Sequence, residues 1–152
     1  MVELSDIDLQ LSKKIVAIVE HGNSLHGAGA HDTALEKYRE SWELLPEPKQ
    51  NWDLAHWIAK CTSRIYLELG VYGEAKTWSL RAVDSKPPGE TSSLILLGAS
   101  YLGLGEEEFA YEFFNKAFEM GRARAFQGFD KKYLNFLTAY KEKNDGFARS
   151  AI

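Results

Sequence analysis

The sequence predicts an all-α fold in which helices follow one another as stacked pairs. Apolar residues recur at helical spacing along most of the chain, and in residues 34–45, ALEKYRESWELL, they form a single face. Glycines and prolines separate these segments, as is typical of helix ends. No sustained alternation of apolar and polar residues indicates a strand, so helices alone are expected.

The first two helices are predicted from capping residues and stop signals. Ser5 is a candidate N-cap for the first helix, which continues as a broadly apolar segment. That helix should end near Gly27 and Gly29. Residues 31–33, His-Asp-Thr, then offer a second N-cap, and Pro46 ends the helix that follows. Together they form the first expected pair.

The third helix is the long central one. It is expected from about residue 49 to 69, with Gly70 as its stop, and it carries two of the four tryptophans, Trp52 and Trp57. At helical spacing the two indoles lie on different faces. We therefore expect Trp52 to pack inward and Trp57 to lie nearer the surface.

The remaining helices show the same pattern of stop signals. They are expected at 72–84, 90–104, 106–120 and near 131–141, with stops at Pro87, Gly105 and Gly121. The tail at 144–152 is short and polar, so it is expected to fray.

Three positions recur with identical spacing. A leucine or tyrosine is followed four residues later by glycine and five residues after that by alanine: Leu25, Gly29, Ala34; Tyr66, Gly70, Ala75; Tyr101, Gly105, Ala110. The glycine permits a tight turn between paired helices, and the small alanine lets the helices approach closely. The first two copies are offset by 41 residues (Leu25 to Tyr66) and the last two by 35 (Tyr66 to Tyr101). The larger first offset means that residues are inserted between the first two copies. We expect these inserted residues to lengthen the central helix at its N-terminus by about two turns.

These residues resemble the tetratricopeptide repeat (TPR), a helix–turn–helix unit of about 34 residues that stacks into an α-solenoid. The fullest copy is LLGASYLGLGEEEFAYEFFNKAF, residues 96–118. The second copy departs from the pattern, with Thr62-Ser63 for the Leu-Gly pair and Ser79 at the main aromatic position. The resemblance implies one domain over residues 1–143, with repeats at about 15–48, 56–89 and 91–124 and a capping helix at about 127–142.

In proteins of this repeat class, the first helix of each pair lines a concave groove. The resemblance places Val16, Val19, Asn23 and His26 there in the first repeat, Trp57, Lys60, Arg64 and Glu68 in the second, and Ser92, Ile95 and Ala99 in the third. The predicted partner-binding residues are Asn23, His26, Trp57, Lys60, Arg64, Glu68, Ser92 and Ile95.

Helix geometry alone places part of this set together. Trp57, Lys60, Cys61 and Arg64 follow an i, i+3, i+4, i+7 pattern and so share one face. A tryptophan beside lysine and arginine has the composition of an interaction hot spot. The alternative is that Trp57 packs on the first repeat while the two cations are solvated.

Some repeats of this class clamp the C-terminal carboxylate of a peptide. Asn23, Lys60 and Arg64 could form part of such a clamp, because a carboxylate needs convergent donors. The positions where further polar or basic clamp residues would be expected are instead held by Val19, Ser92 and Leu96.

Catalytic and metal-binding patterns are not expected. His21, His26 and His31 are five residues apart, a spacing that splays side chains on one helix, so no metal site is predicted. Cys61 has no obvious catalytic partner, and no phosphate loop, nucleophile elbow or zinc-protease motif is present. The sequence predicts a protein that is not an enzyme and needs no cofactor.

Net charge, cysteine content and the lack of long apolar runs limit the kinds of partner and compartment to be expected. The net charge of −4 does not suggest a surface for nucleic acid. One cysteine excludes an internal disulfide, and neither a signal peptide nor an apolar run of membrane-spanning length is apparent. We expect a cytoplasmic protein with a protein partner and no membrane contact; the oligomeric state is left open.

Two further segments resemble one group of short bacterial TPR proteins. They are LLPEPKQNWDLAHWI, residues 44–58, and FQGFDKKYLNFL, residues 126–137, where Phe129 and Lys131 replace the group's usual glutamate and proline. Members are often encoded beside polymorphic or contact-dependent toxins and look like immunity proteins. The resemblance implies a non-catalytic protein that binds and neutralises a toxin. The alternatives are a general adaptor or co-chaperone that binds extended peptides, and self-assembly through the apolar cap.

Overall fold

The computed structural model describes the backbone of residues 1–150 and the side chains of residues 1–145. Its helices are α1 (Leu4–Ile7), α2 (Leu9–Gly27), α3 (His31–Leu44), α4 (Asp53–Glu68), α5 (Tyr72–Asp84), α6 (Ser92–Gly103), α7 (Glu107–Gly121) and α8 (Lys131–Ser150), with single 3₁₀ turns η1 (Lys49–Asn51) and η2 (Arg122–Phe126). Within the described backbone the only β pairing is an isolated bridge between Val2 and Trp52. The all-α prediction is confirmed.

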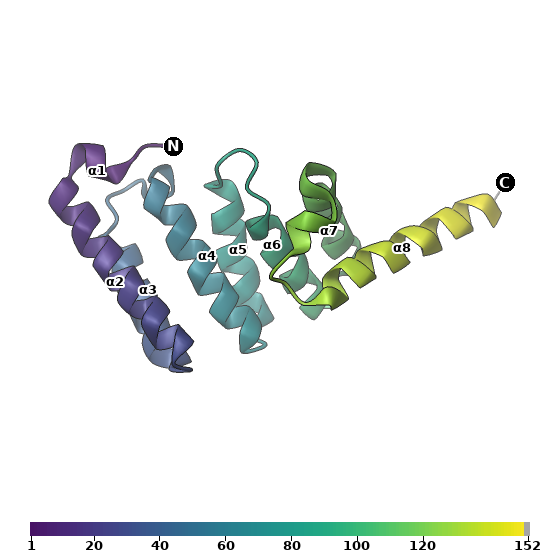
Figure 1. Ribbon diagram of the computed structural model, residues 1–152, viewed down its shortest axis with the longest axis horizontal. Coiled ribbons are helices and arrows are strands. Elements are labelled where there is room, and N and C mark those ends of the chain that lie inside the picture. Colours follow the sequence, from purple (N-terminus) through teal and green to yellow (C-terminus); the bar gives the residue numbers. More distant parts are fainter. Residues whose placement is uncertain (151–152) are drawn as a thin grey trace.

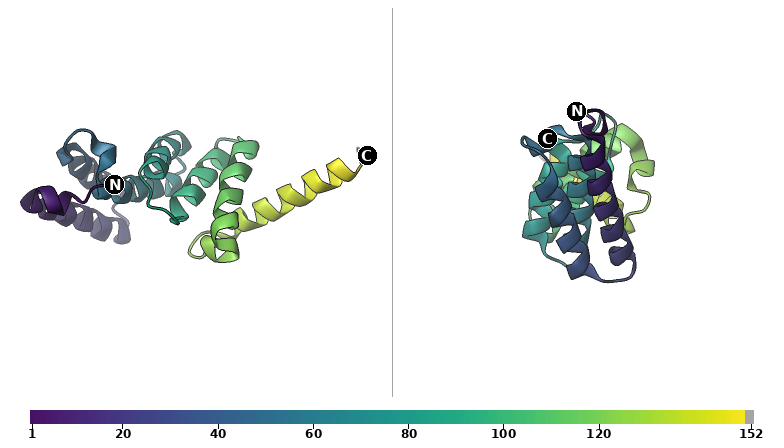
Figure 2. Two further views of the ribbon diagram at one scale, coloured as in Figure 1. Left: turned by 90° about the horizontal axis from the view of Figure 1, so that it is seen from above. Right: turned by 90° about the vertical axis from the view of Figure 1, so that its left-hand side faces the viewer.

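The helices stack as the repeat pattern predicts. The pairs α2/α3, α4/α5 and α6/α7 follow one another along the long axis of the molecule (Figure 1). Helix α8 starts beside α7 and then points away from the stack, as the view from above also shows (Figure 2). Positive φ angles at Gly29 (81°), Gly70 (73°) and Gly105 (78°) occur at the turn inside each pair. Such angles favour glycine, which explains the recurring glycine of the sequence pattern.

Two hydrophobic cores hold the stack together. The N-terminal core joins the first repeat to α4 and is centred on Tyr38, with Ile15, Val19 and Ile58 around it. The C-terminal core joins α6 and α7 to the cap and is centred on Phe114. Both aromatic side chains are fully buried.

Each of these aromatic rings packs against a glycine on the preceding helix. A Cβ atom built at Gly22 would lie 2.6 Å from Tyr38, and one at Gly98 would lie 2.6 Å from Phe114. The middle repeat has Ser63 and Ser79 at the corresponding positions, and both are buried. Ser79 Oγ donates to the Ala75 carbonyl at 2.7 Å, so its hydroxyl is satisfied within its own helix. The departure of the second repeat is therefore a paired change: where the aromatic ring is lost, the glycine is no longer required.

The N-terminus differs from the prediction. The first helix does not run unbroken from Ser5, because Asp8 leaves helical geometry and its side chain accepts a hydrogen bond from the Leu11 backbone N–H at 3.0 Å. Asp8, not Ser5, is thus the N-cap of α2. The short α1 before it folds back and buries Leu4. The Leu4 backbone N–H donates to Asp53 Oδ1 at 2.9 Å, which ties the chain start to the first residue of α4.

The predicted extension of the central helix is wrong. Helix α4 begins at Asp53, and the added residues form the 3₁₀ turn η1 and extended backbone. The Lys49 ammonium group donates to the carbonyls of Trp42, Glu43 and Leu45 at 2.7–3.2 Å, and so caps the C-terminus of α3. Trp52 is half-buried, and its Nε1–H donates to the Pro46 carbonyl at 2.9 Å. These contacts hold the inserted segment against the first repeat instead of continuing the helix.

The C-terminal helix is longer than predicted. Helix α8 continues to Ser150, so the backbone of the tail expected to fray from residue 144 is helical as far as it is described; residues 151–152 lie outside the described part. Tyr133 and Leu137 on α8 are buried in the C-terminal core, as expected for a capping helix. Across the described residues, no helix combines the length and apolar content needed to cross a membrane.

Candidate protein-binding groove

A groove lies between the first helices of the first two repeats. It encloses about 270 Å³ and is lined by Asn23, His26, Tyr38, Trp57, Lys60, Cys61 and Arg64. Successive turns of α4 supply Trp57, Lys60 and Arg64, while α2 supplies Asn23 and His26. The structure thus brings together five residues that the sequence predicts at a binding site. That they bind a partner stays a prediction.

Trp57 both packs against the first repeat and lines the groove. Its indole is half-buried and packs against the N-terminal core, so part of it holds the first two repeats together. The remainder lines the groove. A partly packed tryptophan is a rigid apolar surface that loses little side-chain entropy on binding.

The floor of the groove is neutral. The Tyr38 hydroxyl donates to Asn23 Oδ1 at 2.5 Å, and burial raises the pKa of Tyr38 well above its ordinary value. Burial likewise raises the pKa of the Cys61 thiol, and the charges of Lys60 and Arg64 only partly oppose this. A protonated, largely buried thiol is a poor nucleophile, so Cys61 is a packing residue of the groove.

The two cations of the groove differ in their surroundings. Lys60 Nζ lies 3.8 Å from Glu90 Oε1 and donates to Ser92 Oγ at 3.3 Å, so its charge is already compensated. The Arg64 guanidinium lies 5.4 Å from the Phe129 ring centroid, and among the side chains of residues 1–145 it forms no ion pair. Arg64 is therefore the groove cation that is free to accept an acidic group. Compensation of Lys60 also weakens the carboxylate-clamp alternative, which needs convergent free donors.

Contrary to the prediction, the third repeat does not line the groove. Ile95 is 0% exposed and belongs to the C-terminal core, so its placement on a binding surface is wrong. Val19 and Ala99 are buried as well. Ser92 is half-buried at the start of α6 and donates to Glu90 Oε1 at 2.6 Å. The packing of the neighbouring helices leaves Ile95 and Ala99 inside the stack.

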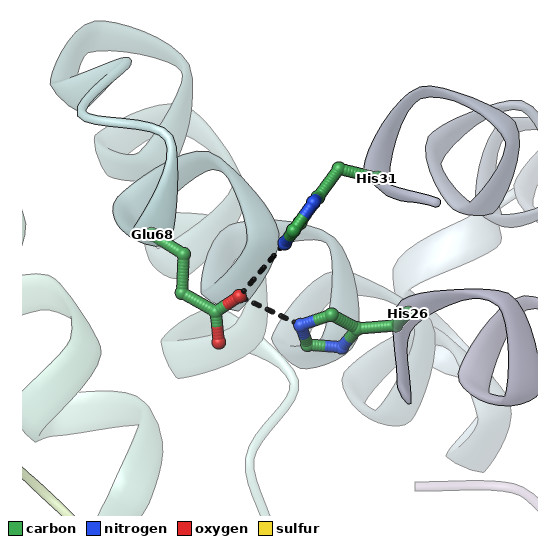
Figure 3. Close-up of side chains that lie close together, drawn as sticks. All are labelled: His26, His31 and Glu68. Carbon is green, nitrogen blue, oxygen red and sulfur yellow. Dashed lines mark hydrogen bonds and ion pairs between the residues drawn. The ribbon is translucent and has the colours of Figure 1, made fainter. Parts of the chain in front are cut away.

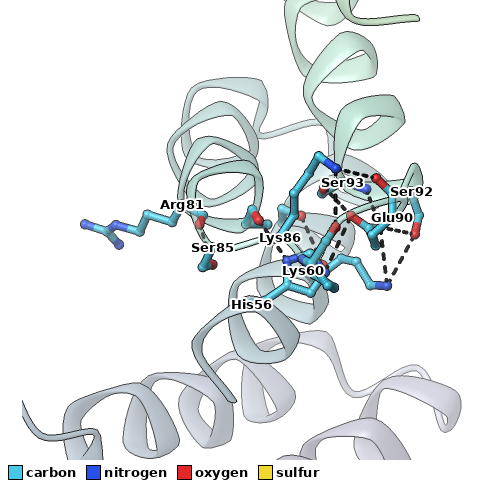
Figure 4. Close-up of polar contacts among 11 residues, drawn as sticks. His56, Lys60, Arg81, Ser85, Lys86, Glu90, Ser92 and Ser93 are labelled. Carbon is cyan, nitrogen blue, oxygen red and sulfur yellow. Dashed lines mark hydrogen bonds and ion pairs between the residues drawn. The ribbon is translucent and has the colours of Figure 1, made fainter. Parts of the chain in front are cut away.

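Glu90 organises a polar cluster that the sequence did not reveal (Figure 4). Its carboxylate accepts hydrogen bonds from the Ser93 backbone N–H at 2.9 Å and from the hydroxyls of Ser92 and Ser93, which anchors the first turn of α6. His56 on α4 faces it, with Nε2 3.6 Å from Glu90 Oε2. The His56 Nδ1–H donates to the Ala82 carbonyl at 2.8 Å, so in the neutral ring Nε2 is a buried acceptor without a partner among the described residues. His56 stands alone among the apolar residues at the start of α4, and nothing in the sequence indicates its contact with Glu90.

This cluster makes the stability of the protein depend on pH. Burial lowers the pKa of His56, against the opposing effects of the Ala82 carbonyl and Glu90. Burial would raise the pKa of Glu90, but the hydrogen bonds from Ser92 and Ser93 outweigh it and lower that pKa. Both groups thus bind protons less readily in the folded state, so the stability they contribute is present at neutral pH and is lost on acidification. We expect the urea midpoint to fall as the pH drops below about 6.5 and further below about 4.3, the ordinary pKa values of His and Glu.

The His56→Gln variant should show a smaller decline in urea midpoint between pH 7 and pH 5.5, because the titrating group is removed. His21→Gln is the matched control, since His21 is exposed on α2, and it should leave the decline unchanged. Equal slopes for His56→Gln and the unaltered protein would contradict this assignment.

A second cluster overturns the argument that the histidines splay apart (Figure 3). Helix α2 ends at Gly27 and His31 opens α3, so the intervening turn brings His26 and His31 together with ring centroids 5.5 Å apart. Glu68, near the end of α4, reaches both: its Oε2 lies 2.7 Å from His26 Nε2 and 3.3 Å from His31 Nε2. The spacing argument assumed a single helix, whereas these residues meet across a turn.

The fold is that of a TPR-like stack of helical repeats. The solved N-terminal domain of stress-induced protein-1 (STI-1) from C. elegans superposes with a TM-score of 0.65 at 15% identity, covering 83% of this chain and 96% of that one. The crystal structure of MamA superposes with a TM-score of 0.64 at 16% identity, covering 96% of this chain and 85% of that one. At such identities the likeness establishes the fold alone. No protein-family model matches the sequence, and no curated protein matches it.

Proposed function

We propose that this protein is a non-catalytic binding module that holds a segment of another protein in the groove between α2 and α4. The observation that carries the proposal is the pairing of Trp57, a rigid apolar surface, with Arg64, a cation without an ionic partner among the described side chains. Tryptophan and arginine are the residue types most enriched at interaction hot spots. Repeat proteins commonly bind through the concave surfaces that stacking creates.

The chemistry of the groove favours a particular kind of segment. Apolar surface at Trp57 suits an aliphatic or aromatic anchor, and Arg64 suits a neighbouring aspartate or glutamate. The groove runs between two helices, a geometry suited to one face of a partner helix or to a loop. Glu68 lies one turn beyond Arg64 and is 45% exposed, so it discourages a second acidic residue at that end.

We further propose that the partner is a bacterial toxin domain, which the protein neutralises by covering it. Support comes from the two segments that resemble the immunity-type group, because one lines the groove and the other contacts a residue that lines it. Residues 44–58 include Trp57, and residues 126–137 include Phe129, whose ring lies against Arg64. A family-specific surface at this place would explain why the resemblance is concentrated in these two segments.

The test begins with the genomic neighbourhood and with growth rescue. If a toxin gene lies beside this gene, co-expression of this protein should restore growth of cells that make the toxin. Failure of rescue by a folded, well-expressed protein would contradict the toxin proposal. An array of short C-terminal peptides separates the alternative, since an adaptor for extended peptides should bind several of them and an occluding immunity protein should bind none.

The groove itself is tested by the double variant Trp57→Ala with Arg64→Glu. We expect partner binding to weaken by about 2 kcal/mol or more, which is roughly 30-fold in Kd, because both the apolar anchor and the charge are removed. The matched control is Phe109→Ala with Lys116→Glu, which makes the same kinds of change at exposed positions on α7. Unchanged affinity of the groove variant, with helicity intact by circular dichroism, would exclude the groove as the binding surface.

A further inference from the structure

The cluster of His26, His31 and Glu68 has the composition of a transition-metal site. Two imidazoles and one carboxylate supply three ligand atoms, all within 4.8 Å of one another. This set suits zinc and related divalent ions, which bind imidazole nitrogen and carboxylate oxygen. It goes beyond the proposed groove function, because nothing in protein binding at Trp57 requires it.

The geometry is close to what a metal needs. Zinc–ligand bonds of about 2.0–2.2 Å in a tetrahedral arrangement place neighbouring ligand atoms about 3.3–3.6 Å apart. The separation of His31 Nε2 from Glu68 Oε2 is 3.3 Å, and that of His26 Nε2 from the same oxygen is 2.7 Å. Only a small rotation of His26 and Glu68 would open the space for an ion. Both side chains are partly exposed, at 22% and 45%, and so are free to make it.

A hydrogen bond behind His31 prepares its ring for coordination. His31 Nδ1 lies 3.1 Å from the Gly29 carbonyl, which can only accept, so Nδ1 carries the hydrogen. In the neutral ring the Nε2 lone pair then points at the Glu68 carboxylate, another acceptor. Two facing acceptors are unfavourable unless a proton or a cation lies between them. A backbone carbonyl on the second ring nitrogen is the arrangement that orients metal-binding histidines.

We propose that His26 Nε2, His31 Nε2 and the Glu68 carboxylate bind a divalent transition-metal ion of the zinc class, with the fourth position open. Water would fill that position when no partner is bound. The ion would connect the turn between α2 and α3 to the end of α4, and thus link the first repeat to the second. His26 also lines the groove, so the open position lies at its edge, where a side chain of a bound protein could replace the water.

The experiment is titration of the tag-free, reduced, metal-free protein with Zn²⁺ by isothermal calorimetry, and with Co²⁺ by visible absorption. We expect one ion per chain at micromolar affinity or tighter, and the intense visible bands of four-coordinate Co²⁺. His31→Gln and Glu68→Gln should each weaken Zn²⁺ binding tenfold or more and abolish those bands. His21→Gln is the matched control on the same helix as His26, and it should change neither.

Two results would overturn the proposal. One is the absence of stoichiometric Zn²⁺ binding by the unaltered protein. The other is equal binding by the unaltered protein and both ligand variants, which would assign the ion elsewhere, for example to Cys61. Circular dichroism of each variant establishes that it is folded. Partner binding by the Trp57 and Arg64 variants is to be measured in metal-free buffer. Failure of the metal site then leaves the groove proposal standing, and the reverse also holds.

Discussion

Phe114→Ala is expected to destabilise the protein by about 3–5 kcal/mol. Phe114 is fully buried in the C-terminal core, and its ring contacts three further aromatic rings, with centroid separations of 6.0 Å to Phe126, 5.5 Å to Tyr133 and 5.9 Å to Phe136. Truncation removes the transfer free energy of the ring and leaves a cavity that these rigid neighbours cannot fill. Equilibrium urea denaturation followed by circular dichroism measures the loss.

Phe109→Ala is the control for this prediction. Phe109 lies on the same helix but is 50% exposed, and its main contact is a stacked Tyr101 at 5.2 Å. An aromatic pair of this kind contributes about 1 kcal/mol. If Phe114→Ala cost no more than Phe109→Ala, the C-terminal core would not depend on Phe114, and the cap would be held by other contacts.

The contribution of Phe114 shows which parts of the fold could be predicted from sequence. Helix pairing, turn positions and the aromatic after each turn all follow from local spacing, because an α-helix fixes which residues share a face. Tyr38 and Phe114 therefore lie where the repeat pattern places them. Helix ends were predicted less well where side chains outside a helix made contacts that the stop signals do not show. Lys49 caps α3 instead of extending α4, and Asp53 is tied to the Leu4 backbone.

The residues of the candidate site were likewise predicted only in part. Trp57, Lys60 and Arg64 lie together because one helix spaces them, and Asn23 and His26 join them because repeats stack regularly. Ile95 was placed wrongly, since the repeat pattern gives its position on the helix but not how tightly the next helix covers it. The contacts of Glu68 with two histidines, and of Glu90 with His56, join residues far apart in sequence. Such pairs depend on how one repeat is oriented on the next, which local spacing does not determine.

Gly98→Val is expected to destabilise the protein by about 3 kcal/mol, at the upper end of the range for overpacking a core. A Cβ at this position would lie 2.6 and 2.7 Å from two atoms of the Phe114 ring. The ring cannot retreat, because Phe126, Tyr133 and Phe136 surround it. Gly73→Val is the control, since a Cβ at Gly73, on the outside of α5, meets nothing within 4 Å. That variant should be close to neutral in urea denaturation.

The decisive measurement is the double variant Gly98→Val with Phe114→Ala. If close contact with the ring is the reason for glycine, the valine should partly fill the cavity left by the missing ring, and the double variant should lose less stability than the sum of the two single changes. The middle repeat already carries a natural counterpart of this double change, with Ser63 and Ser79 buried at the corresponding positions. Additive losses would mean that Gly98 is required for another reason, such as the backbone approach of α7 to α6. A deficit well below the sum would establish that glycine and aromatic ring are a single packing unit, present in the first and third repeats and replaced as a unit in the second.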